Sequence, residues 1–104
     1  MKLGNLRISS KDKLGLISNF AAMIAAGIPI VEVVDSLLED SKGNQKKLLE
    51  TMRADLNQGL HVYQTMAKFP GVFDKVSVNI VKASEEAGTL DVALKDLQIG
   101  TRKD

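Results

Sequence analysis

The sequence has few of the side chains on which most active sites depend. Its 104 residues contain no cysteine and a single histidine, His61. Disulfides, thiol nucleophiles and cysteine-based metal sites are therefore excluded, as is a multi-histidine zinc or iron centre. Three phenylalanines, one tyrosine and no tryptophan provide little surface for stacking nucleic-acid bases.

The charge is also nearly balanced. Fourteen basic and thirteen acidic side chains give a formal net charge of +1, so no global charge draws the chain onto nucleic acid or an anionic membrane. A small nucleic-acid-binding domain using Lys42, Lys46 and Lys47 is an alternative that this balance and the few aromatics disfavour. We expect no nucleic-acid partner.

No short catalytic motif is present. The chain lacks GxxxxGK[ST], GxGxxG, HExxH and GxSxG, and His61 has no base or carboxylate near it in sequence. A cation held by Glu85 or Glu86 with Asp91 is conceivable, but an exposed helix end is the favoured interpretation. The sequence therefore predicts no enzyme, no catalytic residue, no cofactor and no metal.

A run of eighteen uncharged residues, 14–31, reaches the lower length limit for a membrane-spanning helix. Basic residues precede it, as in a signal peptide. However, the run contains Ser18 and Asn19, and Gly27 and Pro29 interrupt it near its end. Glycine ends helices and proline begins them, so we predict a buried helix followed by a turn.

Glycines divide the chain into segments with apolar spacings of three and four, which predicts helices. The fold class is all-α, a bundle of six short antiparallel helices. A lead segment, 1–9, precedes the domain, 10–100, and 101–104 is a frayed or truncated end. The expected helices are 10–26, 29–40, 44–58, 60–68, 72–87 and a sixth that Thr89 caps.

Each expected helix has a predicted core face. These faces are Leu14, Ile17, Phe20, Ala21 and Ile24; Ile30, Val33, Val34, Leu37 and Leu38; Leu48, Leu49, Met52 and Leu56; Leu60, Tyr63, Met66 and Ala67; Phe73, Val76, Ile80, Ala83 and Ala87; and Leu90, Ala93, Leu94 and Leu97.

Acidic residues run against the helix dipole at two helix ends, at Glu85 and at the pair Glu39 and Asp40. Glu85 lies just before the stop at Gly88, where a negative charge is unfavourable. We therefore expect it to accept hydrogen bonds from backbone N–H groups at a facing helix N-terminus. The polar face of the second helix carries Glu32, Asp35, Glu39 and Asp40 with no base. A solvated face is the simpler interpretation, and a partner surface is the alternative.

Four motifs in order resemble a known family. They are Phe20 to Ile30 with the Gly-Ile-Pro-Ile end, Gly59-Leu60 with Tyr63 and Met66, Phe69-Pro70-Gly71-Val72-Phe73, and Ser84-Glu85-Glu86-Ala87-Gly88-Thr89-Leu90. Together they resemble the cytoplasmic F domain of the inner-membrane platform protein of type II secretion and type IV pilus machines. The matching structural positions are Phe20, Gly27, Pro29, Gly59, Pro70, Phe73, Glu85, Gly88 and Leu90. Ser84, Ala87 and the pair His61-Val62 depart from the family pattern, which weakens any analogy to a cation site.

The resemblance implies a non-enzymatic domain on the cytoplasmic face of the bacterial inner membrane. It would be the first such domain of a parent protein that is embedded through segments not present here. It would couple the assembly ATPase to pilin or pseudopilin, with other inner-membrane assembly proteins and a homo-oligomer as further partners. The acidic face of Glu32, Asp35, Glu39 and Asp40 is our candidate for the ATPase surface. A soluble helical adaptor without a membrane tether is the alternative.

Overall fold

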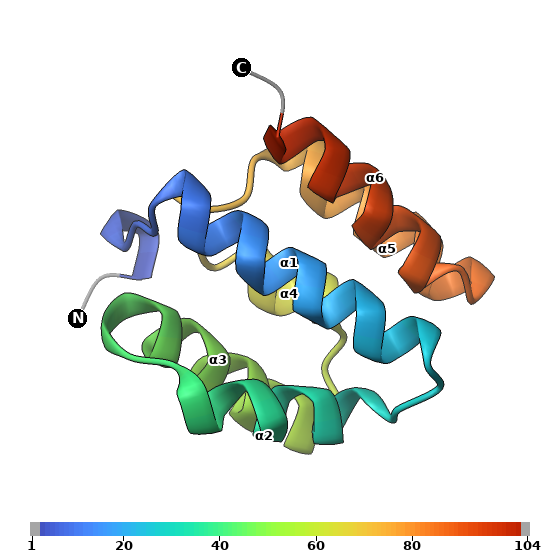
Figure 1. Cartoon of the computed structure of the whole chain (residues 1–104), viewed down its shortest axis with the longest axis horizontal. Helices are drawn as coiled ribbons and strands as arrows, with labels where there is room; N and C mark the ends of the chain where they lie inside the picture. Colours follow the sequence, from blue (N-terminus) through green and yellow to red (C-terminus); the bar gives the residue numbers. More distant parts are fainter. Residues whose placement is uncertain (1–2, 103–104) are drawn as a thin grey trace.

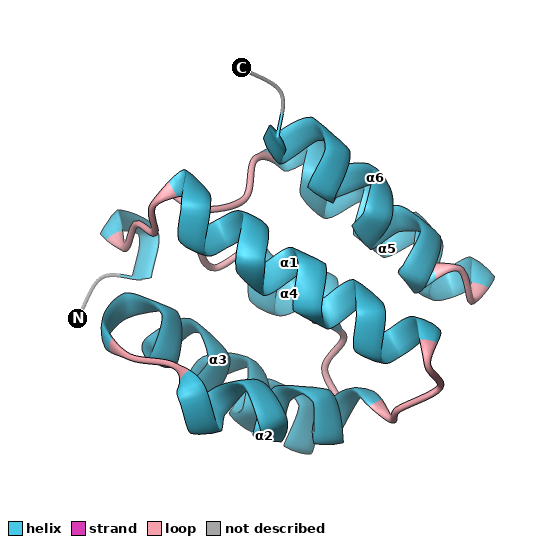
Figure 2. Cartoon of the chain, in the orientation of Figure 1, coloured by secondary structure: helices cyan, strands magenta, loops and turns pink. Residues whose placement is uncertain are grey.

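The computed structural model describes residues 3–102, and six α-helices and one short 3-10 helix account for the regular structure in that range. The 3-10 helix η1 spans Leu3–Asn5. The α-helices are α1 (Ser10–Ala25), α2 (Ile30–Asp40), α3 (Gly43–Asn57), α4 (Val62–Met66), α5 (Lys75–Ala87) and α6 (Leu90–Arg102). Short loops join them, and no strand occurs in the described range (Figure 2). The predicted all-α bundle of six helices is confirmed. Residues 103 and 104 of the expected chain end lie outside the described residues.

The helices form a closed ring of neighbours. Each packs against the next in sequence, and α1 packs most extensively against α6, which closes the ring. Figure 1 shows α1 crossing the centre of the molecule, with the pair α2 and α3 on one side and the pair α5 and α6 on the other. The predicted buried helix followed by a turn is therefore found at α1 and the residues after it. Within the described residues, no helix combines the length and apolar character needed to cross a membrane.

Helix starts follow local capping chemistry. Ser9 caps α1, because its side chain accepts a hydrogen bond from the Asp12 N–H at 3.1 Å. Asp74 caps α5 in the same way, accepting from the Ser77 N–H at 2.8 Å. This cap corrects the expected start of the fifth helix at residue 72. Before the cap, hydrogen bonds from the N–H groups of Val72 and Phe73 to the Phe69 carbonyl form a turn.

The fourth helix is shorter than the expected 60–68. Gly59 adopts a positive φ of 88°, a backbone conformation that residues with a Cβ rarely adopt. The chain then reverses, and His61 precedes the first residue of α4. The His61 N–H donates a hydrogen bond to the Gln64 side-chain oxygen at 2.8 Å. This contact fixes the start of α4 at Val62.

The core lies where most of the apolar stripes meet. Val33, Val34, Leu48 and Leu49 are fully buried, as predicted for the second and third helices. In the sixth helix the predicted Ala93 and Leu94 are buried, and Leu90 and Leu97 pack partly buried at the rim. The sequence did not point to Leu6, Leu16 and Phe69, which also belong to the core.

The predicted core face of the fifth helix is wrong except at Phe73, which is buried just before α5. Val76, Ile80, Ala83 and Ala87 are exposed, as is Ala67 in the turn after α4. The buried residues of α5 are Val81 and Ser84, and Val78 is partly buried. Val78, Val81 and Glu85 share one face of the helix at i, i+3 and i+7. The rotation that turns Glu85 toward α4 therefore buries the two valines and leaves the other apolar face outside.

Candidate functional site

Glu85 joins α5 to the start of α4. Its two carboxylate oxygens accept hydrogen bonds from the backbone N–H groups of Val62, at 3.0 Å, and Tyr63, at 2.8 Å. The Glu85 side chain is only 13% exposed. A helix leaves its first N–H groups without partners inside the helix, and Glu85 satisfies two of them. The predicted bond to a facing helix N-terminus is confirmed.

His61 lies beside this contact but does not form a catalytic pair with Glu85. The Nδ1 atom of His61 is 3.9 Å from the nearer Glu85 oxygen, which is too long for a hydrogen bond. The histidine ring instead stacks on Tyr63, with ring centres 5.8 Å apart. The Lys82 ammonium lies 5.6 Å from the centre of the Tyr63 ring. These contacts cover the α4–α5 junction and orient no proton donor toward a substrate position.

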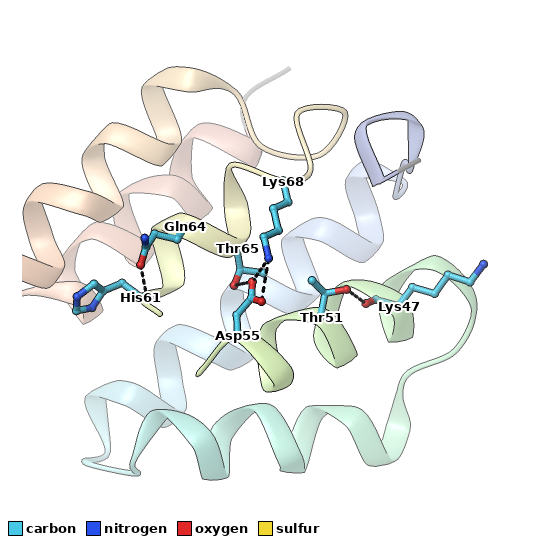
Figure 3. Close-up of polar contacts among 7 residues, drawn as sticks. All are labelled: Lys47, Thr51, Asp55, His61, Gln64, Thr65 and Lys68. Carbon is cyan, nitrogen blue, oxygen red and sulfur yellow. Dashed lines mark hydrogen bonds and ion pairs between the residues drawn. The ribbon is translucent and has the colours of Figure 1, made fainter. Parts of the chain in front are cut away.

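A second polar cluster connects α3 with the segment that contains α4 (Figure 3). Asp55 is 5% exposed. It accepts a hydrogen bond from the Thr65 hydroxyl at 2.7 Å, and Lys68 Nζ lies 2.8 Å from both carboxylate oxygens. The buried carboxylate is therefore paired and hydrogen-bonded, as a buried charge must be. The sequence analysis missed this cluster because its members are 10 and 13 residues apart and form no motif.

Glu85 and Asp91, two of the acidic residues that we considered for a cation, line one surface pocket together with His61. Both Glu85 oxygens are engaged by backbone N–H groups, and Glu86, the next residue, is exposed. Among the residues that the structure describes, no three His, Asp or Glu side chains are placed to hold a metal ion together. The interior contains an apolar cavity of about 30 Å³, lined by side chains that include Phe20, Leu48 and Met52.

The acidic face of α2 is only partly continuous. Glu32, Asp35 and Glu39 line a shallow depression together with residues 26–29 of the preceding turn. Asp40 is exposed at the end of the helix but lies outside this depression. Asp35 is ion-paired with Arg53 of α3. Glu32 and Glu39 are thus the two acidic groups of the depression that do not share this ion pair.

The positions that matched the resemblance lie at turns and in the core. Phe20 and Phe73 are buried. The glycines Gly27, Gly59 and Gly88 have positive φ angles and follow helices α1, α3 and α5. Pro29 precedes the first residue of α2, Pro70 lies exposed in the turn after α4, and Leu90 begins α6. These residues define where the chain turns and how the helices pack.

Comparison with known proteins identifies the family. The family model described as "Type II secretion system (T2SS), protein F" matches residues 16–101. The chain belongs to the type II secretion system protein F family. It is 33% identical over 91 residues to the type IV pilus assembly protein PilC of Myxococcus xanthus, covering 86% of this chain and 22% of that protein.

Two further relatives support the same family, one named for type 4 fimbrial assembly and one for type II secretion. The type 4 fimbrial assembly protein PilC of Pseudomonas putida is 28% identical over 92 residues, 88% of this chain and 23% of the relative. The type II secretion system protein F of Vibrio cholerae is 29% identical over 91 residues, 86% of this chain and 22% of the relative. The chain therefore spans less than a quarter of the length of these relatives.

Proposed function

We propose that this chain is a non-enzymatic platform domain of a type IV pilus or type II secretion machine. It acts on the cytoplasmic face of the bacterial inner membrane and connects the assembly ATPase to pilin or pseudopilin subunits. The observation that carries the proposal is the family match across residues 16–101, with relatives named for pilus assembly and for type II secretion.

The polar chemistry of the interior supports a scaffolding role. The buried carboxylate of Asp55 and the half-buried carboxylate of Glu85 are each engaged by donors from a neighbouring segment. Such groups hold helices in register, because each of their carboxylate oxygens accepts a hydrogen bond from a neighbouring segment. The cavity in the core is lined by apolar side chains, and a cavity of that kind offers no polar group to orient a substrate.

The depression on α2 is the surface that we propose for the ATPase. Glu32 and Glu39 are separated by two helical turns, about 10.5 Å, on one exposed face. Asp35 lies between them and already shares Arg53. A basic surface on the ATPase would complement this face, and such pairing raises the association rate and selects the partner.

Isothermal titration of the chain with the purified assembly ATPase of the same organism tests the proposal. Reversing Glu32 and Glu39 together to Lys leaves the Asp35–Arg53 ion pair intact, and we expect the affinity to fall by about tenfold or more. The matched control reverses Glu50 and Asp96, which are exposed outside the α2 depression and change the net charge equally. Equal losses for the two double variants, or unchanged affinity for the α2 variant, would contradict the α2 surface.

The membrane-platform part of the proposal has its own test. Reading the parent gene on either side of the codons for this chain should show two or more spans of about 20 apolar residues. A second segment that resembles Glu85 to Leu90 should lie beyond the first span. A parent without any such span would favour the soluble adaptor and would leave the family match as a statement about the fold.

A further inference from the structure

Basic side chains gather at the end of the bundle where α1, α3 and α5 begin. We call residues 4–13, 40–47 and 70–75 the basic end. It contains seven basic and three acidic side chains, a net charge of +4. The bases are Arg7, Lys11, Lys13, Lys42, Lys46, Lys47 and Lys75, and the acids are Asp12, Asp40 and Asp74. The rest of the chain carries seven basic and ten acidic side chains, a net charge of −3, so the nearly balanced total hides a separation of charge.

Direct contacts bring the three segments of the basic end together. The Asn44 side chain, in the first turn of α3, donates a hydrogen bond to the Arg7 carbonyl at 2.9 Å. Arg7 also lies against Gly71, where an added Cβ would be 3.4 Å from the Arg7 side chain. The Lys13 ammonium lies 5.7 Å from the centre of the Phe73 ring. The bases therefore share one end of the molecule, although they come from three separate stretches of the sequence.

The charges of the basic end are accessible and mostly uncompensated. Six of the seven bases are exposed, and Lys13 is half-buried. None of the seven takes part in an ion pair in the part of the chain that the structure describes. Of the three acids, Asp74 already caps α5 by accepting a hydrogen bond from the Ser77 N–H. The basic end therefore presents a surplus of positive charge to a partner.

The opposite end of the bundle is acidic. Helix α1 spans 16 residues, about 24 Å, and its last residue, Ala25, lines a depression together with Glu85 and Asp91. Glu86 is exposed beside Glu85, and Glu32 lies in the first turn of α2. Figure 1 shows η1 and the start of α3 on one side of the molecule and the turn between α5 and α6 on the other. This polarity would orient the domain on a charged surface.

The composition of the basic end favours a lipid surface over nucleic acid. Six of its seven bases are lysines, which act as mobile point charges, whereas arginine grips a phosphate through two hydrogen bonds. Phe73, the one aromatic residue in these segments, is buried and provides no ring on which a base could stack. Clusters of about four to eight lysines and arginines are typical of surfaces that bind anionic lipid headgroups.

We propose that the basic end docks on an anionic lipid bilayer, with the phosphate headgroups facing its seven bases. The attraction belongs to the whole patch, so it requires neither a pocket nor the insertion of apolar side chains. The inference goes beyond the proposed function and concerns a surface other than the α2 depression. A domain held at the inner membrane, as proposed above, would meet the bilayer at high local concentration, so weak binding is sufficient. The turn between α5 and α6 then points away from the membrane.

Vesicle co-sedimentation with two lipid compositions tests the proposal. The chain should bind vesicles of equal parts phosphatidylglycerol and phosphatidylethanolamine, with half of the protein bound at roughly millimolar accessible lipid. Binding should fall by about tenfold or more between about 0.05 and about 0.5 M salt, since salt screens the headgroup charge. Vesicles of phosphatidylcholine alone should bind no protein. Equal binding to both compositions would overturn the proposal, and so would no binding to the anionic vesicles, which would favour an acidic protein partner instead.

Two lysine pairs provide a matched comparison. Lys42→Gln with Lys46→Gln removes two charges from the basic end and leaves the Asn44 hydrogen bond in place, so vesicle binding should weaken by about tenfold or more. Lys82→Gln with Lys95→Gln removes two exposed charges elsewhere. This control should weaken binding by less than about twofold, because at physiological salt a charge acts over only about 8 Å. Circular dichroism confirms that both variants are folded. Equal losses would show that net charge rather than the basic end binds the vesicles, which would overturn the proposal.

Site-specific labelling tests the orientation, because the chain has no native cysteine. Ser10→Cys and Ala87→Cys each place one thiol at an exposed position, the first at the start of α1 and the second at the end of α5. A fluorophore at position 10 should be quenched by lipids that carry a nitroxide on the headgroup in the anionic vesicles. A fluorophore at position 87 should keep its emission. Equal quenching at the two positions, or stronger quenching at position 87, would overturn the proposal.

Two further measurements separate this inference from the alternatives. At the same salt concentration, single-stranded polyuridylate should bind the chain more weakly than the anionic vesicles do. Tighter binding to polyuridylate would overturn the proposal in favour of nucleic acid. Glu32→Lys with Glu39→Lys, the variant that tests the ATPase surface, should bind the anionic vesicles at least as strongly as wild type, because it adds positive charge. Loss of vesicle binding in this variant would assign the membrane contact to α2. Neither vesicle result alters the titration with the ATPase, so the two proposals can fail separately.

Discussion

Helices α2 and α5 are similar in length and in apolar content, yet they use their apolar residues differently. In α2 the apolar side chains form one stripe, and Val33, Val34 and Leu37 are buried by its packing against α1 and α3. In α5 the apolar residues lie on two faces, and the face with Val81 is buried. The comparison shows that an apolar pattern determines helix orientation only when it has one stripe.

The second determinant in α5 is polar. Glu85 accepts hydrogen bonds from the Val62 and Tyr63 N–H groups, and this contact fixes the rotation of α5 about its own axis. Helix α2 has a more exposed polar contact, the ion pair of Asp35 with Arg53, and burial of its single apolar stripe selects its orientation. The rotation that Glu85 imposes buries Val81 and exposes Val76, so a polar contact decides which apolar face remains on the surface.

Valine-to-alanine changes should give the largest difference in the free energy of unfolding between the buried and the exposed apolar residues. Val34→Ala in α2 and Val81→Ala in α5 should each lower the free energy of unfolding by about 2 kcal/mol, because both side chains are fully buried and each change leaves a cavity. Val76→Ala should be neutral or stabilising by up to about 0.5 kcal/mol, since the side chain is 65% exposed and alanine favours the helix. Urea unfolding at low protein concentration measures all three. A larger loss for Val76→Ala than for Val81→Ala would show that α5 is rotated the other way.

The sequence predicted the helices well because glycine, proline and capping residues act locally. It predicted the core face of α2, with Val33, Val34 and Leu37, because only one stripe was available. For α5 it favoured the wrong face, because Val78 and Val81 compete with Val76 and Ile80 and the choice depends on packing against α4.

The polar contacts of Glu85 and Asp55 also differed in how far the sequence could predict them. Glu85 was predictable, since an acid at the end of a helix opposes the dipole and so indicates a bond elsewhere. The contact of Asp55 with Thr65 and Lys68 was not predictable, because nothing in the local sequence distinguishes Asp55 from a solvated acid. The acidic surface on α2 remains a prediction, and the structure adds that Asp40 lies outside the depression that contains the other three acids.

Removing the carboxylate of Glu85 tests the same comparison, and we expect an effect on stability no larger than that of the buried valine changes. Glu85→Ala should lower the free energy of unfolding by about 2 kcal/mol, because two N–H groups of α4 lose their acceptor. Glu85→Gln keeps one acceptor oxygen and should lose about half as much. The neighbouring Glu86 is exposed, so Glu86→Ala should change stability by less than about 0.5 kcal/mol. Amide hydrogen exchange at Val62 and Tyr63 should accelerate in Glu85→Ala alone. Equal stability of the two alanine variants would mean that Glu85 does not hold α4.

The smallest expected effect concerns how the two helices begin. Asp74 caps α5, and its hydrogen bonds with the Ser77 side chain and backbone N–H, together with nearby Lys13, lower the pKa of its carboxyl below the ordinary value of 3.8. Pro29, at the start of α2, provides no side-chain cap. A lowered pKa stabilises the folded state above the unfolded pKa, and this contribution is lost as the pH falls through the folded pKa. Asp74→Asn keeps a capping oxygen but does not titrate. In urea unfolding from about pH 6 down to about pH 2.5, the wild-type advantage over Asp74→Asn should be constant above about pH 4 and should shrink below it. An advantage that does not change with pH would show that the Asp74 charge contributes nothing to the start of α5.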